Sequence, residues 1–216
     1  MKLTQTIISL SLLAATIPTF ASTDTDVLKL QQEWDRIKYQ VADKDAKLQA
    51  IHELEKTAAQ TVAANPNSVE PVIWEGIILS TDAGIVKSMS ALGTVKKAKT
   101  LLEQAIQTNP GAMNGSAQAS LGVLYYQVPG WPVSFGDDKK AEQYLKQALQ
   151  IGPNDIDNNY FYGDFLLRAK RYNEAETYLN AALKAPARPN RQIADAGRRQ
   201  EIKLALAEAQ KNLASK

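Results

Sequence analysis

The side chains that usually carry out catalysis are scarce in this sequence of 216 residues. It has no cysteine and one histidine, His52, which lies within a predicted helix. No glycine-rich phosphate loop follows a strand, and no pair of carboxylates stands out as an acid–base couple. We therefore predict that the protein is not an enzyme and that it holds no metal ion or cofactor.

Side chains that could bind a partner are concentrated in the segment 127–138. Its two prolines and two glycines exclude a helix and favour a compact, ordered loop. Trp131 and Phe135 are large apolar side chains on this loop, so they either pack inward and hold it in place or are available to a partner. Asp137 or Asp138 is expected to cap the helix that follows.

Basic residues gather near the C-terminus, where a proline-rich break precedes a charged amphipathic helix. Acidic residues lie among them and aromatic residues do not, so we predict a solvated helix face. The net charge of the whole chain is only +2, so we do not expect a nucleic acid as partner. The basic residues are Arg188, Arg191, Arg198, Arg199 and Lys203.

A repeated pattern of small and large apolar residues predicts the helices that must position these side chains. Each of three segments has an alanine, a leucine four residues later and a second alanine three residues after that, which share one helical face before a proline ends the helix. A glycine lies in an apolar run before each segment. Because a glycine inside a helix costs about 1 kcal/mol relative to alanine, we expect another helix to pack against its bare backbone. The positions are Gly76, Ala98, Leu102, Ala105 and Pro110, then Gly122, Ala141, Leu145, Ala148 and Pro153, then Gly163, Ala175, Leu179, Ala182 and Pro186.

These paired helices resemble tetratricopeptide repeats (TPRs). The resemblance implies an all-α fold, a solenoid of helical hairpins with capping helices, and side chains from the first helix of each repeat on a concave groove. Over about residues 70–200 the chain also resembles a group of exported bacterial TPR proteins that share a Pro-Gly-Trp-Pro loop followed by Phe-Gly-Asp. The groove positions that the family register implies are Ile73, Ile77 and Ser80, then Ala119, Val123 and Tyr126, then Tyr160, Asp164 and Leu167, with Arg168 beside them.

The repeats divide the sequence into four predicted parts. The glycine and the first alanine lie further apart in the first two repeats than in the third, which predicts long turns at residues 81–94 and 127–138. Turns inside stacked repeats share one edge, so these two should be neighbours in space. The parts are a signal peptide (1–21), an irregular helical pair that caps the stack (22–66), three repeats (67–190) and a helix that caps the last repeat (191–216).

The N-terminal residues have the layout of a secretory signal peptide. Lys2 precedes an apolar run at residues 7–15, and Ala21 is the predicted last residue before cleavage. A membrane anchor is the alternative, but this run is shorter than the roughly 20 residues that span a bilayer. The absence of cysteine excludes a lipid anchor and disulfide bonds. We predict an exported protein without stable membrane insertion, periplasmic if the source is a Gram-negative bacterium.

Three functions are compatible with these observations. The leading one is a periplasmic adaptor or scaffold whose groove holds a peptide or a partner protein. The second is a ligand-handling accessory protein resembling the T component of TRAP transporters, which predicts a closed apolar cavity, and the third is an architectural subunit of an envelope assembly, which predicts a large apolar patch. The candidate contact residues are Trp131, Phe135, Tyr126, Tyr160, Asp164 and Arg168.

Overall fold

The computed structural model describes residues 20–215, and their side chains from residue 23 onwards. The predicted signal peptide lies outside the described residues except for its last two positions, so its cleavage remains a prediction. Among the described residues no helix is long and apolar enough to cross a membrane. The helices are α1 (Phe20–Gln40), α2 (Lys44–Ala64), α3 (Glu70–Val86), α4 (Leu92–Thr108), α5 (Ser116–Gln127), α6 (Asp138–Ile151), α7 (Ile156–Arg168), α8 (Tyr172–Lys184) and α9 (Gln192–Ala214), with short 3₁₀ turns at Met89–Ala91 and Ala112–Gly115.

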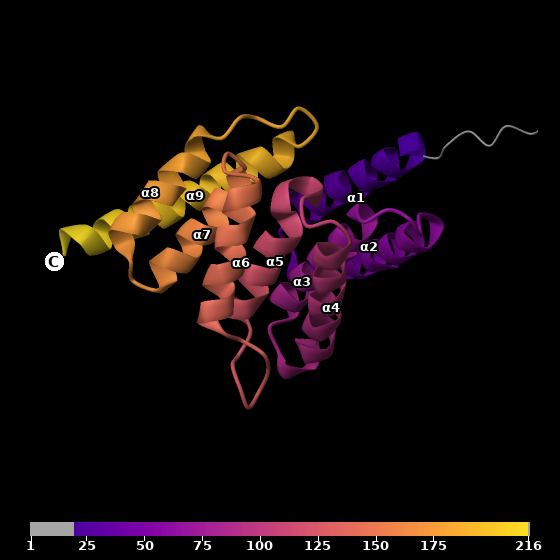
Figure 1. Ribbon diagram of the computed structural model, residues 1–216, viewed down its shortest axis with the longest axis horizontal. Coiled ribbons are helices and arrows are strands. Elements are labelled where there is room, and N and C mark those ends of the chain that lie inside the picture. The colour runs from indigo at the N-terminus through magenta and orange to yellow at the C-terminus, as the bar shows by residue number, and fades with distance from the viewer. Residues whose placement is uncertain (1–19, 216) are drawn as a thin grey trace, which may run out of the picture.

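The helices form a curved stack of antiparallel hairpins, as Figure 1 shows. The hairpins are α1 with α2, α3 with α4, α5 with α6, and α7 with α8. Helix α9 packs along α8 and α7, and it also contacts α1. The predicted all-α helical-repeat fold is confirmed.

Each repeat glycine lies against the leucine of the second helix in its own repeat. A Cβ atom added at Gly122 would lie 2.7 Å from Leu145 Cγ, closer than real Cβ contacts allow, and the same holds in the other two repeats. The leucines are fully buried, so they have little room to move aside. The expectation that a helix packs against each bare glycine is confirmed. The three pairs are Gly76 with Leu102, Gly122 with Leu145, and Gly163 with Leu179.

The turn predicted at residues 81–94 is mostly helix, so that prediction was wrong. Helix α3 continues to Val86 and α4 begins at Leu92. The apolar run of α3 extends through the buried Ala83 and the partly buried Val86, and this burial stabilises the additional helical turns. Only residues 87–91, which include the 3₁₀ turn, connect the two helices.

The segment between α5 and α6 is an ordered loop held by backbone hydrogen bonds. The Gly136 N–H donates to the Pro129 carbonyl at 3.0 Å, and the Asp137 N–H donates to the Tyr125 carbonyl at 2.8 Å. The Asp137 side chain accepts from the backbone N–H groups of the first turn of α6, which confirms the predicted cap. This loop and the α3–α4 turn lie at the same edge of the stack (Figure 1).

Candidate binding groove

A groove of about 530 Å³ lies on the concave face formed by α1, α3, α5 and α7. Its volume is within the range of known ligand pockets. The predicted groove residues Ile77, Ser80, Ala119 and Val123 line it. The family register therefore places two of the three predicted positions on each of α3 and α5 at the groove, whereas the buried Ile73 and Tyr126 do not line it.

The register fails on α7, where Tyr160 and Asp164 are not among the lining residues. Asp157, Asn158 and Phe161 line the groove instead, because α9 packs on this part of the concave face. Tyr160 lies under the Arg198 guanidinium of α9, 4.3 Å from ring centre to Cζ.

The other predicted residues of this face interact with one another outside the groove. The Tyr126 hydroxyl donates to Asp164 Oδ2 at 2.6 Å, and Tyr126 is buried. The Arg168 guanidinium lies 5.0 Å from the centre of the Tyr126 ring. Tyr126, Asp164 and Arg168 thus form a packed polar contact between α5 and α7.

The two aromatic residues of the 128–137 loop have different surroundings. The Phe135 ring packs edge-on against Tyr125, with ring centres 5.5 Å apart, and lies near the Lys99 ammonium group. Trp131 is 90% exposed. Neither residue lines the groove, and Trp131 is an exposed aromatic group on the loop at the edge of the stack.

The first and last helices meet and close one end of the groove. Arg191 donates to both carboxylate oxygens of the buried Asp35 on α1, at 2.6 and 2.7 Å. One turn further along α1, the Tyr39 hydroxyl donates to Glu201 of α9 at 3.3 Å. Gly197 lies so near the Tyr39 ring that an added Cβ would be 2.2 Å from Cδ1. No pattern in the sequence indicated this contact between α1 and α9.

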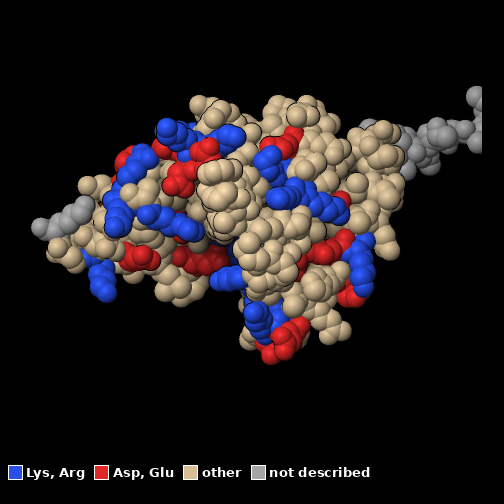
Figure 2. All heavy atoms as spheres, turned by 90° about the horizontal axis from the view of Figure 1, so that it is seen from below, with Lys and Arg blue, Asp and Glu red and all other residues tan. Residues whose placement is uncertain are grey.

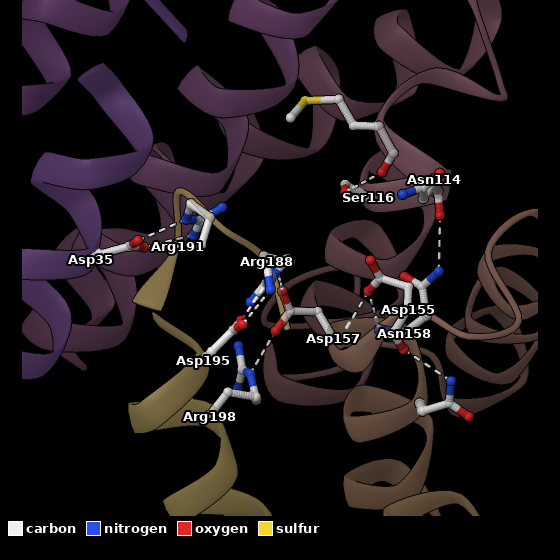
Figure 3. Close-up of polar contacts among 12 residues, drawn as sticks. Asp35, Asn114, Ser116, Asp155, Asp157, Asn158, Arg188, Arg191, Asp195 and Arg198 are labelled. Atoms are coloured by element: carbon white, nitrogen blue, oxygen red, sulfur yellow. Dashed lines mark hydrogen bonds and ion pairs between the residues drawn. The ribbon is translucent and has the colours of Figure 1, made fainter. Parts of the chain in front are cut away.

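The C-terminal basic residues form a buried ion-pair network at this closed end (Figure 3). Arg188 Nε donates to Asp195 at 2.7 Å, and its Nη1 donates to Asp157 at 2.8 Å. Arg198 Nε also donates to Asp157, at 2.6 Å, and Arg198 is only 3% exposed.

The predicted solvated helix face was therefore wrong for most of these residues. Arg198 and Arg191 turn toward α7 and α1, where carboxylates compensate for their burial. Arg199 donates to the carbonyls of Leu183 and Ala185 at the end of α8, which satisfies carbonyls that have no partner within that helix. Only Lys203 is solvent-exposed as predicted.

Burial and neighbouring charges shift pKa values in this network, among them those of Asp157 and Lys38. Burial alone would raise the pKa of Asp157, but Arg198 and Arg188 outweigh it and hold that pKa well below its usual range. Burial, and then the nearby charge of Arg198, lower the pKa of Lys38 to about 8. Asp157 is therefore a permanent anion at neutral pH.

Two buried hydrogen-bond donors at the groove have no partner among the described residues. They are Trp74 Nε1 and Arg188 Nη2, and both side chains line the groove. An unpaired buried donor costs about 1–3 kcal/mol. A ligand that supplied a hydrogen-bond acceptor to either donor would therefore remove this cost. Trp74 stands in an apolar run, where its sequence context indicates only packing.

His52 does not take part in the groove. Its Nε2 atom lies 3.1 Å from Asp82 Oδ1 on the opposite face of α3, beside the partly buried Glu55. Among residues 20–215 no group of histidine, aspartate and glutamate side chains has an arrangement that could hold a metal ion.

Comparison with known proteins supports the repeat assignment. The tetratricopeptide repeat family matches residues 134–199, from the end of the loop through α6, α7 and α8 into α9. No curated protein matches the sequence. A chain from a solved structure on the functional characterization of Pseudomonas aeruginosa pilF is 14% identical and aligns with 90% of this chain and all of its own length, at a TM-score of 0.37. The family match and the helical hairpins show an all-α helical-repeat fold that is similar to tetratricopeptide repeats over residues 134–199.

Proposed function

We propose that the protein is an exported adaptor whose concave groove holds a peptide segment of a partner protein. The observation that carries this proposal is the groove itself, which is lined by first helices of successive hairpins. Its wall mixes apolar residues such as Ile77 and Val123 with charged residues such as Lys47 and Asp157. Such a surface suits a peptide, with apolar contacts for affinity and polar groups for orientation.

The alternative of a ligand-handling protein has one observation in its favour. The contact between α1 and α9 closes one end of the groove, and a volume of about 530 Å³ would also accept a small molecule. This alternative predicted an apolar enclosure, however, and the closed end is the most highly charged part of the groove. The composition of the wall therefore favours the peptide.

Export is part of the proposal and draws support from the start of α1. After cleavage behind Ala21 the chain would begin Ser-Thr-Asp-Thr-Asp, a composition that favours the start of a helix. Thr23 is buried, and its hydroxyl lies 2.6 Å from Asn65 Oδ1, so the fold includes the first residues of the expected mature chain. N-terminal sequencing of the protein from a periplasmic fraction tests this, and a retained Met1 would contradict it.

The groove hypothesis can be tested by filling the groove without disturbing the fold. Gly84 of α3 lines the groove and is exposed, and a Cβ atom added there meets nothing within 4 Å. Gly84→Trp should therefore fold and obstruct the groove. Gly93 of α4 is equally open and does not line the groove, which makes Gly93→Trp a matched control.

We expect envelope proteins that co-purify with the wild type and with Gly93→Trp to be lost with Gly84→Trp. Quantitative mass spectrometry of the three affinity purifications measures this loss. If Gly84→Trp retains every partner, the groove is not the binding site. The same comparison with Trp131→Ala tests whether the exposed loop supplies a second contact.

A further inference from the structure

The closed end of the groove has an excess of cationic groups on its wall. Five lysine and arginine side chains line the groove, against two carboxylates. All but Lys47 lie where α1, α7 and α9 meet, the region drawn in Figure 3. The cations are Lys38, Lys47, Arg188, Arg191 and Arg198, and the carboxylates are Asp155 and Asp157.

Three further carboxylates hold the cations in place without lining the groove. Asp35 pairs with Arg191, Asp195 with Arg188, and Glu201 with Arg198. The whole cluster is therefore electrically neutral. The charges are unevenly placed: all five cations line the groove, whereas three of the five carboxylates do not. Figure 2 likewise shows Lys and Arg interspersed with Asp and Glu on the face it draws, rather than one broad basic surface.

The two unpaired donors specify what kind of group would complete the site. Trp74 is 4% exposed and has an N–H group without an acceptor, and Arg188 has an unpaired Nη2. The Arg191 guanidinium lies 5.0 Å from the Trp74 ring centre, which places Trp74 beside the ion-pair network. Among residues 20–215, Lys47 Nζ donates only to the Lys38 carbonyl, at 3.1 Å, and forms no ion pair with a carboxylate. Buried N–H groups without an acceptor, on a groove wall that has more cations than carboxylates, are suited to a carboxylate.

We infer that the closed end of the groove is a subsite for an acidic side chain, aspartate or glutamate, of the bound peptide. This inference rests on the proposed function and specifies its ligand. The carboxylate accepts hydrogen bonds from Arg188 and Trp74, and Lys47 compensates its charge. The apolar and hydroxyl residues of α3 and α5 hold the rest of the peptide.

Selection from a displayed library of random dodecapeptides tests the inference. The library is selected on the wild type, and each enriched peptide is then measured against Gly84→Trp and Gly93→Trp. Peptides that bind the wild type and Gly93→Trp but not Gly84→Trp occupy the groove. We expect these groove-dependent peptides to be enriched in aspartate and glutamate.

The outcomes separate this inference from the proposed function. Groove-dependent peptides without acidic enrichment would overturn the acidic subsite and leave peptide binding in the groove intact. If no peptide depends on the groove, both proposals fail. A selected peptide that binds equally well after its acids are replaced by the corresponding amides also overturns the subsite.

Point variants then identify the binding groups, with isothermal titration calorimetry of one selected acidic peptide as the measurement. Lys47→Gln leaves no carboxylate without its ion-pair partner, because Lys47 pairs with none among the described residues. The loss of its charge should weaken binding of the acidic peptide by about fivefold. Lys96→Gln on the exposed surface of α4 is the matched control and should leave the affinity unchanged. Arg188→Lys keeps a charge beside Asp157 and Asp195 but removes Nη2. It should lower the affinity for the acidic peptide more than the affinity for the peptide with the corresponding amides. Equal affinity for the acidic peptide in all three variants would contradict the assignment of these groups.

Discussion

Trp131 and Phe135 illustrate how strongly the role of a residue depends on its immediate surroundings. Both stand on the same loop, and either could pack inward or contact a partner. Phe135 packs against Tyr125, whereas Trp131 is 90% exposed. The loop backbone decides between them, because the hydrogen bonds that close the loop direct position 135 toward α5.

This difference predicts that alanine substitutions at the two positions change stability by different amounts. Phe135→Ala should lower the free energy of unfolding by about 2 kcal/mol, because it removes a partly buried ring. Trp131→Ala should change it by less than about 0.5 kcal/mol. Urea unfolding of both variants measures the two values. A large loss for Trp131→Ala would show that Trp131 is packed in solution.

Glu55 on α2 predicts a pH dependence of stability. Its Oε1 is buried without a partner in the described structure, and burial, followed by repulsion from Asp82, raises its pKa to about 7. The folded state therefore binds this proton more tightly than the unfolded chain does. The resulting stability is fully present below about pH 4.5 and is lost as the pH rises through 7.

Glu55→Gln should remove this component of the pH dependence. Because the group is partly exposed, we expect a relative gain of about 1 kcal/mol for the variant over the wild type between pH 4.5 and 8. Unfolding curves at both pH values measure it. Glu53→Gln, at an exposed position of the same helix, is the control and should show no such gain. Parallel pH profiles for wild type and Glu55→Gln would contradict the raised pKa.

Within each repeat, the packing of a glycine against a leucine sets the distance between the two helices. The same contact occurs in three successive hairpins, which is why the pattern could be found in the sequence. It is a local contact between neighbouring helices, so its position follows from residue spacing alone. The contact between α9 and α1 joins distant parts of the chain, so residue spacing does not record it.

Gly122→Ala should destabilise the protein although alanine is the better helix former. The gain in helix propensity is about 1 kcal/mol, and overpacking against the buried Leu145 costs about 1–3 kcal/mol, so we expect a net loss of about 1 kcal/mol. Gly93→Ala, with open space around its Cβ position, should instead stabilise by about 0.5 kcal/mol. Thermal unfolding compares the two. Stabilisation by Gly122→Ala would mean that the helices separate without cost.

Over the whole molecule, the stack is closed by the contact between its first and last helices. Asp35 and Arg191 are 156 residues apart in sequence, and both are largely buried. This contact positions the arginine network and closes one end of the groove. The curvature of the stack brings α1 within reach of α9 (Figure 1).

A double-mutant cycle tests whether the molecule is closed in solution. Arg191→Met should cost about 3 kcal/mol, because it leaves the buried Asp35 unpaired. Adding Asp35→Asn to that variant should recover part of the loss, with a coupling energy of about 1–3 kcal/mol. The surface pair Lys56 and Glu53 is the control, with an expected coupling near zero. A coupling near zero for Asp35 and Arg191 would show that α1 and α9 are apart.

The helical hairpins, the glycine–leucine contacts, the cap at Asp137 and two groove positions on each of α3 and α5 could be predicted from the sequence. These features depend on helical periodicity and on contacts between neighbouring helices, which residue spacing records. Only the tertiary structure decided the roles of Arg188, Arg191 and Arg198, because their partners Asp157 and Asp35 lie on distant helices. The role of Trp74 likewise depends on the tertiary structure, since nothing local shows that its N–H group lacks an acceptor at the groove. Burial and charge pairing depend on how the whole stack curves, and no short segment of the chain specifies that curvature.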